Sequence, residues 1–356
     1  MKKKMVAVLL TAALAAAGVM GCSGSSTETE ASSAATTAAE TTAEAKETEA
    51  SEAATTEAAA AAGTHVGETG DIAEPGSGKG QKVVLITIDS MDQHWVNMDK
   101  GCQKAAEELG CDYQWMAPDV KDDAKQIECV NNAVAGGATA ILIAANGPDA
   151  ITAALEEADE AGVKIVQVDS FANYPCVQKL GTDNKTAGKM AGEEVLKALQ
   201  AKGVTEGKIG IVSVNKATTS TVDREEGFRE AFEGTAYEIL ETQYADGDAA
   251  KSKDAAANFI TQGCVALFGA NEGSCVGVGN AVAEDGNQIV AAGMDKSDAV
   301  IQLIKGDSLI CTMAQNPDVM GYEGMYAAIT AINGGNVAPE YIDTGVSILT
   351  KDSLAE

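Results

Sequence analysis

The sequence is poor in histidine and in positive charge, and each shortage excludes a class of function. Only 2 of the 356 residues are histidines, and the cysteines and histidines follow no metal-ligand spacing, which argues against a zinc finger or a zinc hydrolase. Lysine and arginine number 25 against 53 aspartate and glutamate residues, so the formal net charge is -28. Because nucleic acid is bound through a basic face, we expect no nucleic-acid partner.

The first 22 residues have the pattern of a bacterial export signal. Residues 2–4 are lysines, and the apolar run of residues 5–20 is too short to cross a membrane comfortably. Residues 19–22, Val-Met-Gly-Cys, resemble the lipobox of bacterial lipoproteins, in which the cysteine is lipidated. We therefore expect lipidation at Cys22 and anchoring to the outer face of the cell membrane. An ordinary secretory peptide with an incidental cysteine is the alternative.

Residues 23–80 consist mainly of alanine, threonine, serine and glutamate, with almost no large apolar side chains. Such a segment cannot bury enough apolar surface to offset the entropy lost on ordering, so it predicts a disordered tether. Its glutamates supply part of the net charge, which therefore says little about a binding site. The cysteines beyond Cys22 resemble small buried apolar residues, and we expect no metal site and no cofactor.

From residue 81 onward, short apolar runs rich in β-branched residues alternate with amphipathic helical stretches such as residues 122–135 and 149–161. The predicted strands are residues 83–88, 140–145, 164–168, 209–214, 265–269, 289–294 and 309–314, with a weaker one at 113–116. This alternation predicts an α/β fold with parallel sheets that are covered on both faces. The number of strands favours two Rossmann-like lobes.

Carboxylate or amide side chains follow nearly every predicted strand. They include Asp89, Asp92, Asn146, Asp169, Asn215, Asn271, Asp295 and Gln315. Ligands of open parallel sheets bind beyond the carboxyl ends of the strands, so this row predicts a binding site. Any one of these residues could instead cap the following helix, but capping alone is a poor explanation for the whole row.

The residue types fit a ligand with several hydroxyl groups. Carboxylates and amides hydrogen-bond to adjacent hydroxyls, and Arg224 can donate through a planar fork. Trp95 and Phe171 can offer a flat face to the C–H side of a sugar ring. The alternatives are a core position for Trp95 and a surface ion pair for Arg224.

Several short motifs, taken together and in order, resemble the periplasmic ribose/galactose-type sugar-binding proteins, which are type I solute-binding components of ABC importers. The matching segments are residues 92–101, 168–169, 181–188, 223–228, 268–272, 293–295 and 314–315. The resemblance covers residues 82–349. It implies two lobes joined by a hinge of three crossings, with a monosaccharide (a pentose, hexose or related polyol) held in the cleft between them.

The resemblance also implies ligand contacts and lobe boundaries. The contacts fall on Asp92, His94, Trp95, Asn146, Asp169, Ser170, Arg224, Asn271, Asp295 and Gln315. The N-terminal lobe comprises residues 81–183 and 316–343, and the C-terminal lobe comprises residues 184–315 and 344–356. Ribose binders differ at three positions, where this chain has Ala144, Ser170 and Gly247, so the resemblance implies an enlarged or reshaped pocket.

The function implied is capture of the sugar by hinge closure and delivery to the permease of an ABC importer by a monomeric, membrane-anchored protein. A sensory protein that presents a sugar-like signal to a chemoreceptor or sensor kinase is the alternative. We expect no enzyme, because Ser90, Asp92 and His94 are too close in sequence to form a nucleophile, a base and its orienting group. Residues 277–282 lack the third glycine of a dinucleotide site. The export signal and the absence of a helix-turn-helix pattern exclude a repressor.

Overall fold

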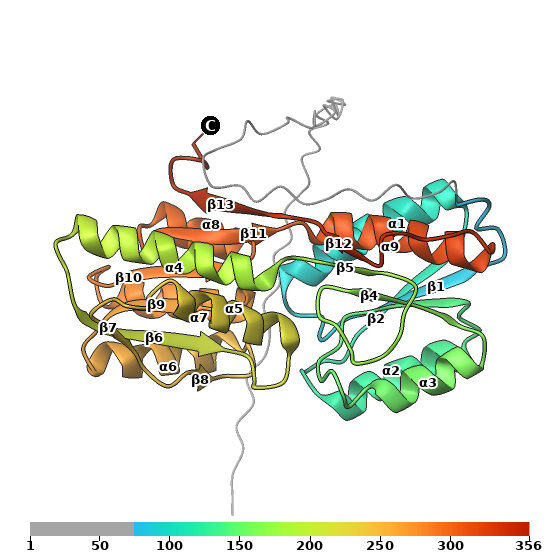
Figure 1. Ribbon diagram of the computed structural model, residues 1–356, viewed down its shortest axis with the longest axis horizontal. Coiled ribbons are helices and arrows are strands. Elements are labelled where there is room, and N and C mark those ends of the chain that lie inside the picture. The colour runs from blue at the N-terminus through green and yellow to red at the C-terminus, as the bar shows by residue number, and fades with distance from the viewer. Residues whose placement is uncertain (1–74, 356) are drawn as a thin grey trace, which may run out of the picture. The chain divides into compact units, whose positions relative to one another are not determined.

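The computed structural model describes residues 75–355, and these form two α/β lobes (Figure 1). The first lobe contains β1 (Lys82–Ile86), α1 (Gln93–Leu109), β2 (Asp112–Met116), α2 (Asp123–Ala135), β3 (Ala140–Ile143), α3 (Thr152–Glu160), β4 (Lys164–Val168), β5 (Lys179–Gly181), α9 (Pro317–Ile332) and β12 (Tyr341–Asp343). The second contains α4 (Asn184–Ala201), β6 (Gly207–Ser213), α5 (Thr219–Glu230), β7 (Tyr237–Ile239), β8 (Gln243–Tyr244), α6 (Ala249–Thr261), β9 (Cys264–Gly269), α7 (Glu272–Glu284), β10 (Val290–Met294), α8 (Asp298–Lys305), β11 (Cys311–Gln315) and β13 (Val346–Thr350). The predicted fold class is confirmed.

The sheet of the first lobe is parallel throughout, with strand order β12-β5-β4-β3-β1-β2. Side chains alternate between its faces, so Val83 and Leu85 join the core beneath α1 and α9. Val84 and Ile86 join a second core on the other face, beneath α2 and α3. Burial on both faces explains why these strands read as continuous apolar runs in the sequence.

The sheet of the second lobe has strand order β13-β11-β10-β9-β6-β7, and β8 pairs with β6. Its strands are parallel except for β13, which pairs with β11 in the antiparallel sense. One core lies under α4 and α5, where the rings of Phe228 and Phe268 stack with centroids 4.5 Å apart. The short strands β5, β7, β8 and β12 were not predicted, because two or three residues are too few to show a periodic pattern.

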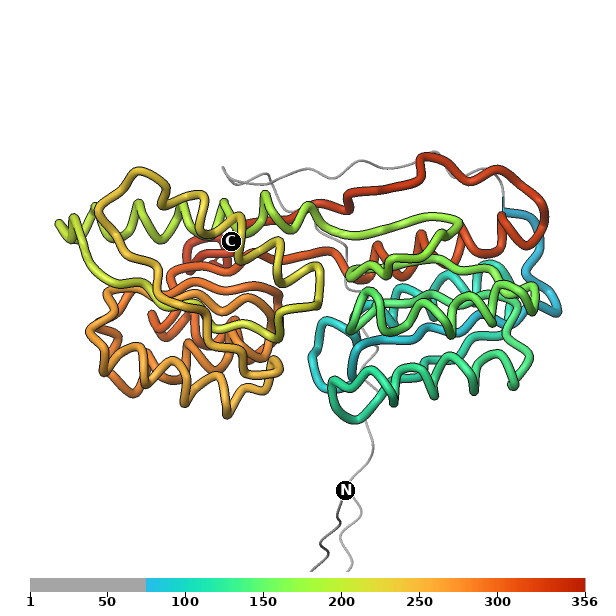
Figure 2. Tube along the Cα trace, turned by 60° about the horizontal axis from the view of Figure 1, so that its bottom comes forward, coloured from blue at the N-terminus to red at the C-terminus, as the bar shows by residue number. Residues whose placement is uncertain are grey.

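The chain passes between the lobes three times, after β5, after β11 and after β12 (Figure 2). The backbone N–H and the hydroxyl of Thr344 both donate to the carbonyl oxygen of Gly181, at 2.7 and 3.0 Å. Asn316 donates through its side-chain amide to the carbonyl oxygen of Thr344 at 2.7 Å. Hydrogen bonds therefore hold the three connections together.

Several helices begin at the polar residues that follow the strands. The side chain of Asn271 accepts from the backbone N–H of Ser274 at 3.1 Å, which caps α7. Asp92 also stands in the cap position before α1, but its side chain makes no capping hydrogen bond. Asp92 is therefore available for other contacts.

The export signal, Cys22 and residues 23–74 of the expected tether lie outside the described residues. Residues 75–80 were assigned to the disordered tether, but they pack on the first lobe. The side-chain amide of Asn333 donates to the carbonyl oxygen of Pro75 at 2.7 Å, and the backbone N–H of Gly78 donates to the carbonyl oxygen of Leu109 at 2.9 Å. Within residues 75–355, no helix combines the length and apolar character needed to cross a membrane.

Candidate functional site

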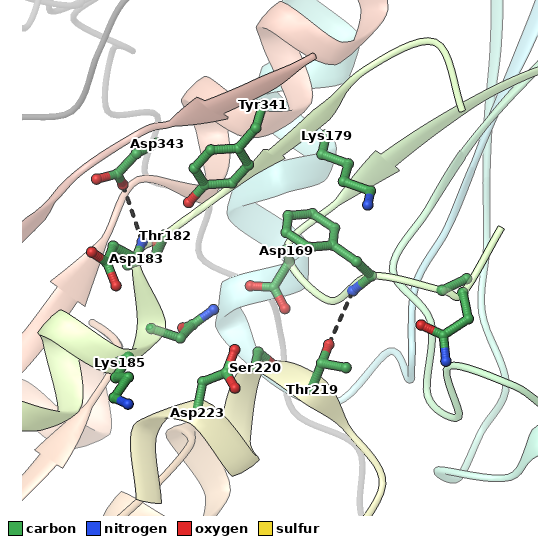
Figure 3. A pocket seen from close by; sticks show the side chains of 14 residues that line it. Asp169, Lys179, Thr182, Asp183, Lys185, Thr219, Ser220, Asp223, Tyr341 and Asp343 are labelled. Atoms are coloured by element: carbon green, nitrogen blue, oxygen red, sulfur yellow. Dashed lines mark hydrogen bonds between the residues drawn. The ribbon is translucent and has the colours of Figure 1, made fainter. Parts of the chain in front are cut away.

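A cavity of about 680 Å³ lies between the lobes, beside the three connections (Figure 3). It is lined by Asp169, Phe171, Ala172, Asn173, Lys179, Thr182, Asp183, Asn184, Lys185, Thr219, Ser220, Asp223, Tyr341 and Asp343. Two of them were singled out in the sequence, Asp169 as a ligand contact and Phe171 as a flat face for a sugar ring. Asp92, His94, Asn271, Asp295 and Gln315 lie in a polar cluster that adjoins this cavity at Asp169.

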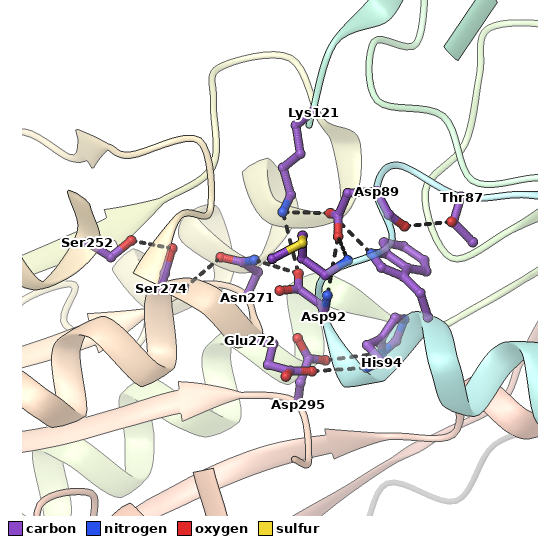
Figure 4. A network of polar contacts seen from close by, with 12 residues as sticks. Thr87, Asp89, Asp92, His94, Lys121, Ser252, Asn271, Glu272, Ser274 and Asp295 are labelled. Carbon is purple, nitrogen blue, oxygen red and sulfur yellow. Dashed lines mark hydrogen bonds and ion pairs between the residues drawn. The ribbon is translucent and has the colours of Figure 1, made fainter. Parts of the chain in front are cut away.

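Within that cluster, His94 lies between two carboxylates that come from different lobes. Its Nε2 is 2.9 Å from Oδ1 of Asp169 in the first lobe, and its Nδ1 is 3.5 Å from Oδ1 of Asp295 in the second. The backbone N–H of His94 donates to Glu272 Oε2 at 2.9 Å (Figure 4). The amide of Gln315 donates to Asp295. All five residues are buried, so these contacts join the lobes in the interior.

Asp169 and Asp295 occupy similar places in the two lobes. Asp169 follows β4, which lies between β3 and β5, and Asp295 follows β10, which lies between β9 and β11. Both have left-handed backbone conformations, with φ of 58° and 73°. Such conformations are costly for residues other than glycine and concentrate at functional sites. The two lobes therefore present equivalent strained carboxylates to one imidazole.

The carboxylates decide the charge of His94. Burial alone lowers the pKa of an imidazole, but Asp169 and Asp295 outweigh burial and raise the pKa of His94 to about 9. Burial likewise opposes ionisation of Asp169, yet the charge and hydrogen bond of His94 hold the pKa of that carboxyl below its usual value. At neutral pH the centre of the cluster is thus an imidazolium between carboxylates.

A second part of the cluster surrounds Asp92. Lys121 Nζ lies 2.7 Å from Asp89 Oδ2 and 3.5 Å from Asp92 Oδ2, and Asn271 donates to Asp92 Oδ2 across the lobes at 3.3 Å (Figure 4). Burial, together with the negative charges of Asp89 and Glu272, raises the pKa of Asp92 to about 7 although Lys121 opposes the rise. Protonation of this carboxyl therefore falls near neutral pH.

Lys121 also fills the space that Gly247 leaves open. A Cβ at Gly247 would stand 3.1 Å from Lys121 Nζ and 2.8 Å from Asn271 Nδ2. Gly247 is one of the three positions at which the resemblance implied a difference from ribose binders and a reshaped pocket. Here a lysine from the opposite lobe lies beside this glycine.

Three buried polar atoms of predicted site residues have no hydrogen-bond partner: Arg224 Nη2, Gln315 Oε1 and Asn146 Oδ1. Arg224 is 2% exposed, so it is no surface ion-pair residue. Its Nε donates to Asn184 at 2.8 Å and its Nη1 to the carbonyl oxygen of Ala270 at 3.0 Å. Buried donors and acceptors are rarely left unpaired, so each of these atoms has the capacity to bond to a polar ligand.

Trp95 and Ser170 complete the predicted set. Trp95 is packed in the core of the first lobe, donates to Asp89 Oδ2 at 3.3 Å, and meets the His94 ring edge-on at 4.7 Å. Its contact with a ligand stays a prediction. Ser170 is buried, and its hydroxyl lies 3.3 Å from that of Thr219 in the other lobe.

The structure adds three residues to the cluster. Asp89 follows a predicted strand and Glu272 ends the matching segment 268–272, but neither was among the ligand contacts that the resemblance implied. Lys121, in the loop between β2 and α2, carried no signal at all, because a lysine in a polar loop is ordinary in a sequence. In residues 75–355, no three histidine, cysteine, aspartate or glutamate side chains are arranged to hold a metal ion.

Comparison with known proteins identifies the relatives of this architecture. The chain is 26% identical to the ribose import binding protein of Haemophilus influenzae over 75% of this chain and 91% of the relative. It is also 26% identical to the D-allose-binding periplasmic protein of Escherichia coli, over 72% of this chain and 86% of that protein.

A solved structure is similar over nearly its whole length. It is a carbohydrate transporter solute-binding protein of Agrobacterium radiobacter in complex with D-arabinose, with a TM-score of 0.74 and 27% identity, covering 78% of this chain and 97% of that one. Residues 83–336 match the periplasmic binding protein domain, a family of transport binding proteins. With this match and the paired lobes, the chain belongs to the periplasmic binding protein family.

Proposed function

We propose that this protein captures a sugar (a pentose, hexose or related polyol) in the cleft between its lobes and delivers it to the permease of an ABC importer. The observation that carries the proposal is the set of buried, unpaired atoms on Arg224, Gln315 and Asn146. One donor and two acceptors in the interior suit a neutral ligand whose hydroxyls both donate and accept. The ribose-, allose- and arabinose-binding relatives support the same ligand class.

Contacts between the lobes support capture by hinge closure. The Thr218 hydroxyl donates to the carbonyl oxygen of Asn146 at 2.9 Å, and Asn271 donates to Asp92 at 3.3 Å. These bonds form only where the lobes approach each other. A sugar that bonds to groups of both lobes has differential affinity for the closed arrangement, and this difference in affinity drives closure.

The proposal includes the cellular setting. We infer that residues 1–22 direct export, that Cys22 carries lipid, and that residues after it tether a monomeric, non-catalytic binding protein to the outer face of the membrane. The proposed lobes are residues 81–183 with 316–343 and residues 184–315 with 344–356. A tether keeps the binding domain near the permease at high effective concentration. Growth with radiolabelled palmitate tests the anchor: the wild type should be labelled, and Cys22→Ser should not.

Sugar binding is tested by calorimetry and thermal shift with D-ribose, D-allose, D-arabinose and D-fucose. We expect one of them to bind and to raise the melting temperature, because a ligand that binds only the folded state stabilises it. Asp169→Asn should weaken binding at least tenfold, whereas Asp119→Asn, an exposed residue on the first lobe, should bind as the wild type does. Absence of binding to every sugar of this panel and to further pentoses, hexoses and cyclitols would contradict the proposal. Loss of sugar uptake on gene deletion separates import from sensing.

A further inference from the structure

The cavity beside the hinge is distinct from the polar cluster. It holds about 680 Å³, within the roughly 300–1,000 Å³ of pockets for drug-sized ligands, and more than a single sugar ring occupies. Asp169 belongs to both regions, because its Oδ1 faces His94 and its side chain also lines the cavity. In Figure 3, Asp169 lies amid the lining residues, between Tyr341 and Ser220. A ligand bound at Asp169 can therefore extend from the cluster into the cavity.

Closure of the lobes forms one wall of this cavity. Thr219 of the second lobe accepts through its hydroxyl oxygen from the backbone N–H of Phe171 at 3.2 Å, and lies 3.3 Å from the hydroxyl of Ser170. Ser170 stands between Asp169 and Phe171 in the chain, and its small side chain fills little space. The cavity is thus assembled by the same closure that brings the polar cluster together.

Phe171 gives the cavity a rigid apolar surface. Its ring meets Tyr341 edge-on at 6.0 Å, and Lys179 Nζ lies 5.7 Å from its centre. Gly181 lies close to the ring, since a Cβ there would stand 2.7 Å from Cζ of Phe171. A ring held in this way is suited to contact the C–H face of a second ring.

The rest of the lining is mostly polar and carries both signs of charge. Hydroxyls come from Thr219 and Ser220, and an amide from Asn173. Carboxylates come from Asp183, Asp223 and Asp343, and ammonium groups from Lys179 and Lys185. An apolar ring together with hydroxyls, an amide and several carboxylates is a set of contacts that suits another polyhydroxylated or oxygen-linked group.

We propose that the captured sugar is a glycoside, whose sugar unit lies at Asp169 and Arg224 and whose second ring, joined through an oxygen, occupies the hinge-side cavity against Phe171. This inference rests on the proposed sugar binding and narrows its ligand class.

Calorimetry tests the inference on the full chain. The probes are the sugar of the panel that binds most tightly, its methyl and phenyl glycosides, and disaccharides that contain it. We expect a phenyl glycoside or a disaccharide to bind at least tenfold more tightly than the free sugar. A tighter phenyl glycoside identifies an aromatic substituent, and a tighter disaccharide identifies a second sugar. If the free sugar binds as well as or better than every glycoside, the inference is wrong and sugar binding stands. If neither binds, both proposals fail.

Variants locate the second ring. Phe171→Ala should weaken binding of the glycoside about tenfold and that of the free sugar less than threefold. Asp223→Asn, at an exposed position, gives a second test of the same split in case Phe171→Ala does not fold. The control is Tyr244→Ala, an exposed aromatic residue of the second lobe that does not line the cavity, and it should change neither affinity. If both cavity variants lose affinity equally for the free sugar and for the glycoside, the inference is wrong.

Discussion

His94 lies 2.9 Å from Asp169 and 3.5 Å from Asp295, so a single imidazole joins equivalent carboxylates of the two lobes. Burial opposes ionisation of Asp169, and the charge and hydrogen bond of His94 outweigh that cost. The arrangement couples the approach of the lobes to the charge of one histidine, and it makes the stability of the protein depend on pH.

Replacing His94 with glutamine should lower the free energy of unfolding by about 3 kcal/mol at pH 7, because Asp169 and Asp295 would stay buried without a cation between them. Chemical denaturation of wild type and His94→Gln measures the difference. Lys125→Gln removes an exposed ion pair with Asp119 and should change little. A neutral effect at His94 would mean that the buried pairing does not stabilise the closed lobes.

The pH dependence of that difference has a definite sign. Asp169 and Asp295 raise the pKa of His94 to about 9, above its value of about 6.5 in the unfolded chain. The stability that His94 contributes is therefore complete below about pH 6.5 and is lost as the pH rises through 9. The melting temperatures of wild type and His94→Gln should converge over this window. A difference that is the same at pH 6 and pH 10 would contradict it.

Ionisation of Asp92 should change the stability of the protein at a lower pH than the titration of His94 does. Burial raises the pKa of this carboxyl from its ordinary value of 3.8 to about 7, so ionisation of Asp92 removes stability as the pH rises through 7. Asp92→Asn cannot ionise and keeps an oxygen that accepts from Asn271. The free energy of unfolding of Asp92→Asn relative to wild type should rise between pH 4 and pH 7 and then stay constant, with a gain of roughly 4 kcal/mol. A constant difference across that range would show that Asp92 ionises normally.

Gly247→Ala should disturb the contact between the lobes. Gly247 has φ of 64°, and a Cβ there would stand 2.8 Å from Asn271 Nδ2 and 3.1 Å from Lys121 Nζ. Gly263→Ala is the matched control, because φ is 78° and nothing lies within 4 Å of the added Cβ. Both variants should lose about 1 kcal/mol through backbone strain, but only Gly247→Ala should also weaken sugar binding. Equal sugar affinities would exclude a role for this contact in closure.

Arg224→Lys should weaken sugar binding at least tenfold. Nη2 of Arg224 is unpaired in the interior and can donate to the sugar, and lysine lacks the planar fork that holds this donor in place. Arg229→Lys is the control on the same helix. Arg229 is partly exposed and bonds to Glu225 and Thr242, so its replacement should leave affinity unchanged. Calorimetric titration of both variants with the same sugar gives the comparison.

Much of the fold could be predicted because it rests on local pattern. The run beginning at Val83 is apolar because both faces of its sheet are covered, and all the predicted strands are present with small shifts at their ends. The site could be predicted in outline for a similar reason, since Asp169 and Asp295 each follow a strand and parallel strands end at one edge.

The partners of these residues depended on the tertiary structure. Asn271 both caps α7 and bonds to Asp92, so a residue at a strand end can cap a helix and take part in the polar cluster at the same time. Lys121 reaches Asp89 and Asp92 from a loop whose sequence is unremarkable for a surface lysine. Such contacts depend on how two lobes approach through the hinge.

By itself the sequence determined the alternation of strands and helices, the doubling of the lobes and the row of polar residues at the strand ends. The alternation follows from local periodicity, the two lobes from the number of strands, and the polar row from the residues directly after each strand. Only the tertiary structure decided that His94 lies between two carboxylates, that Arg224 is buried with an unpaired nitrogen, and that a cavity adjoins Asp169. The physical reason is that pairing across the cleft depends on the geometry of three separate connections, which no local pattern encodes.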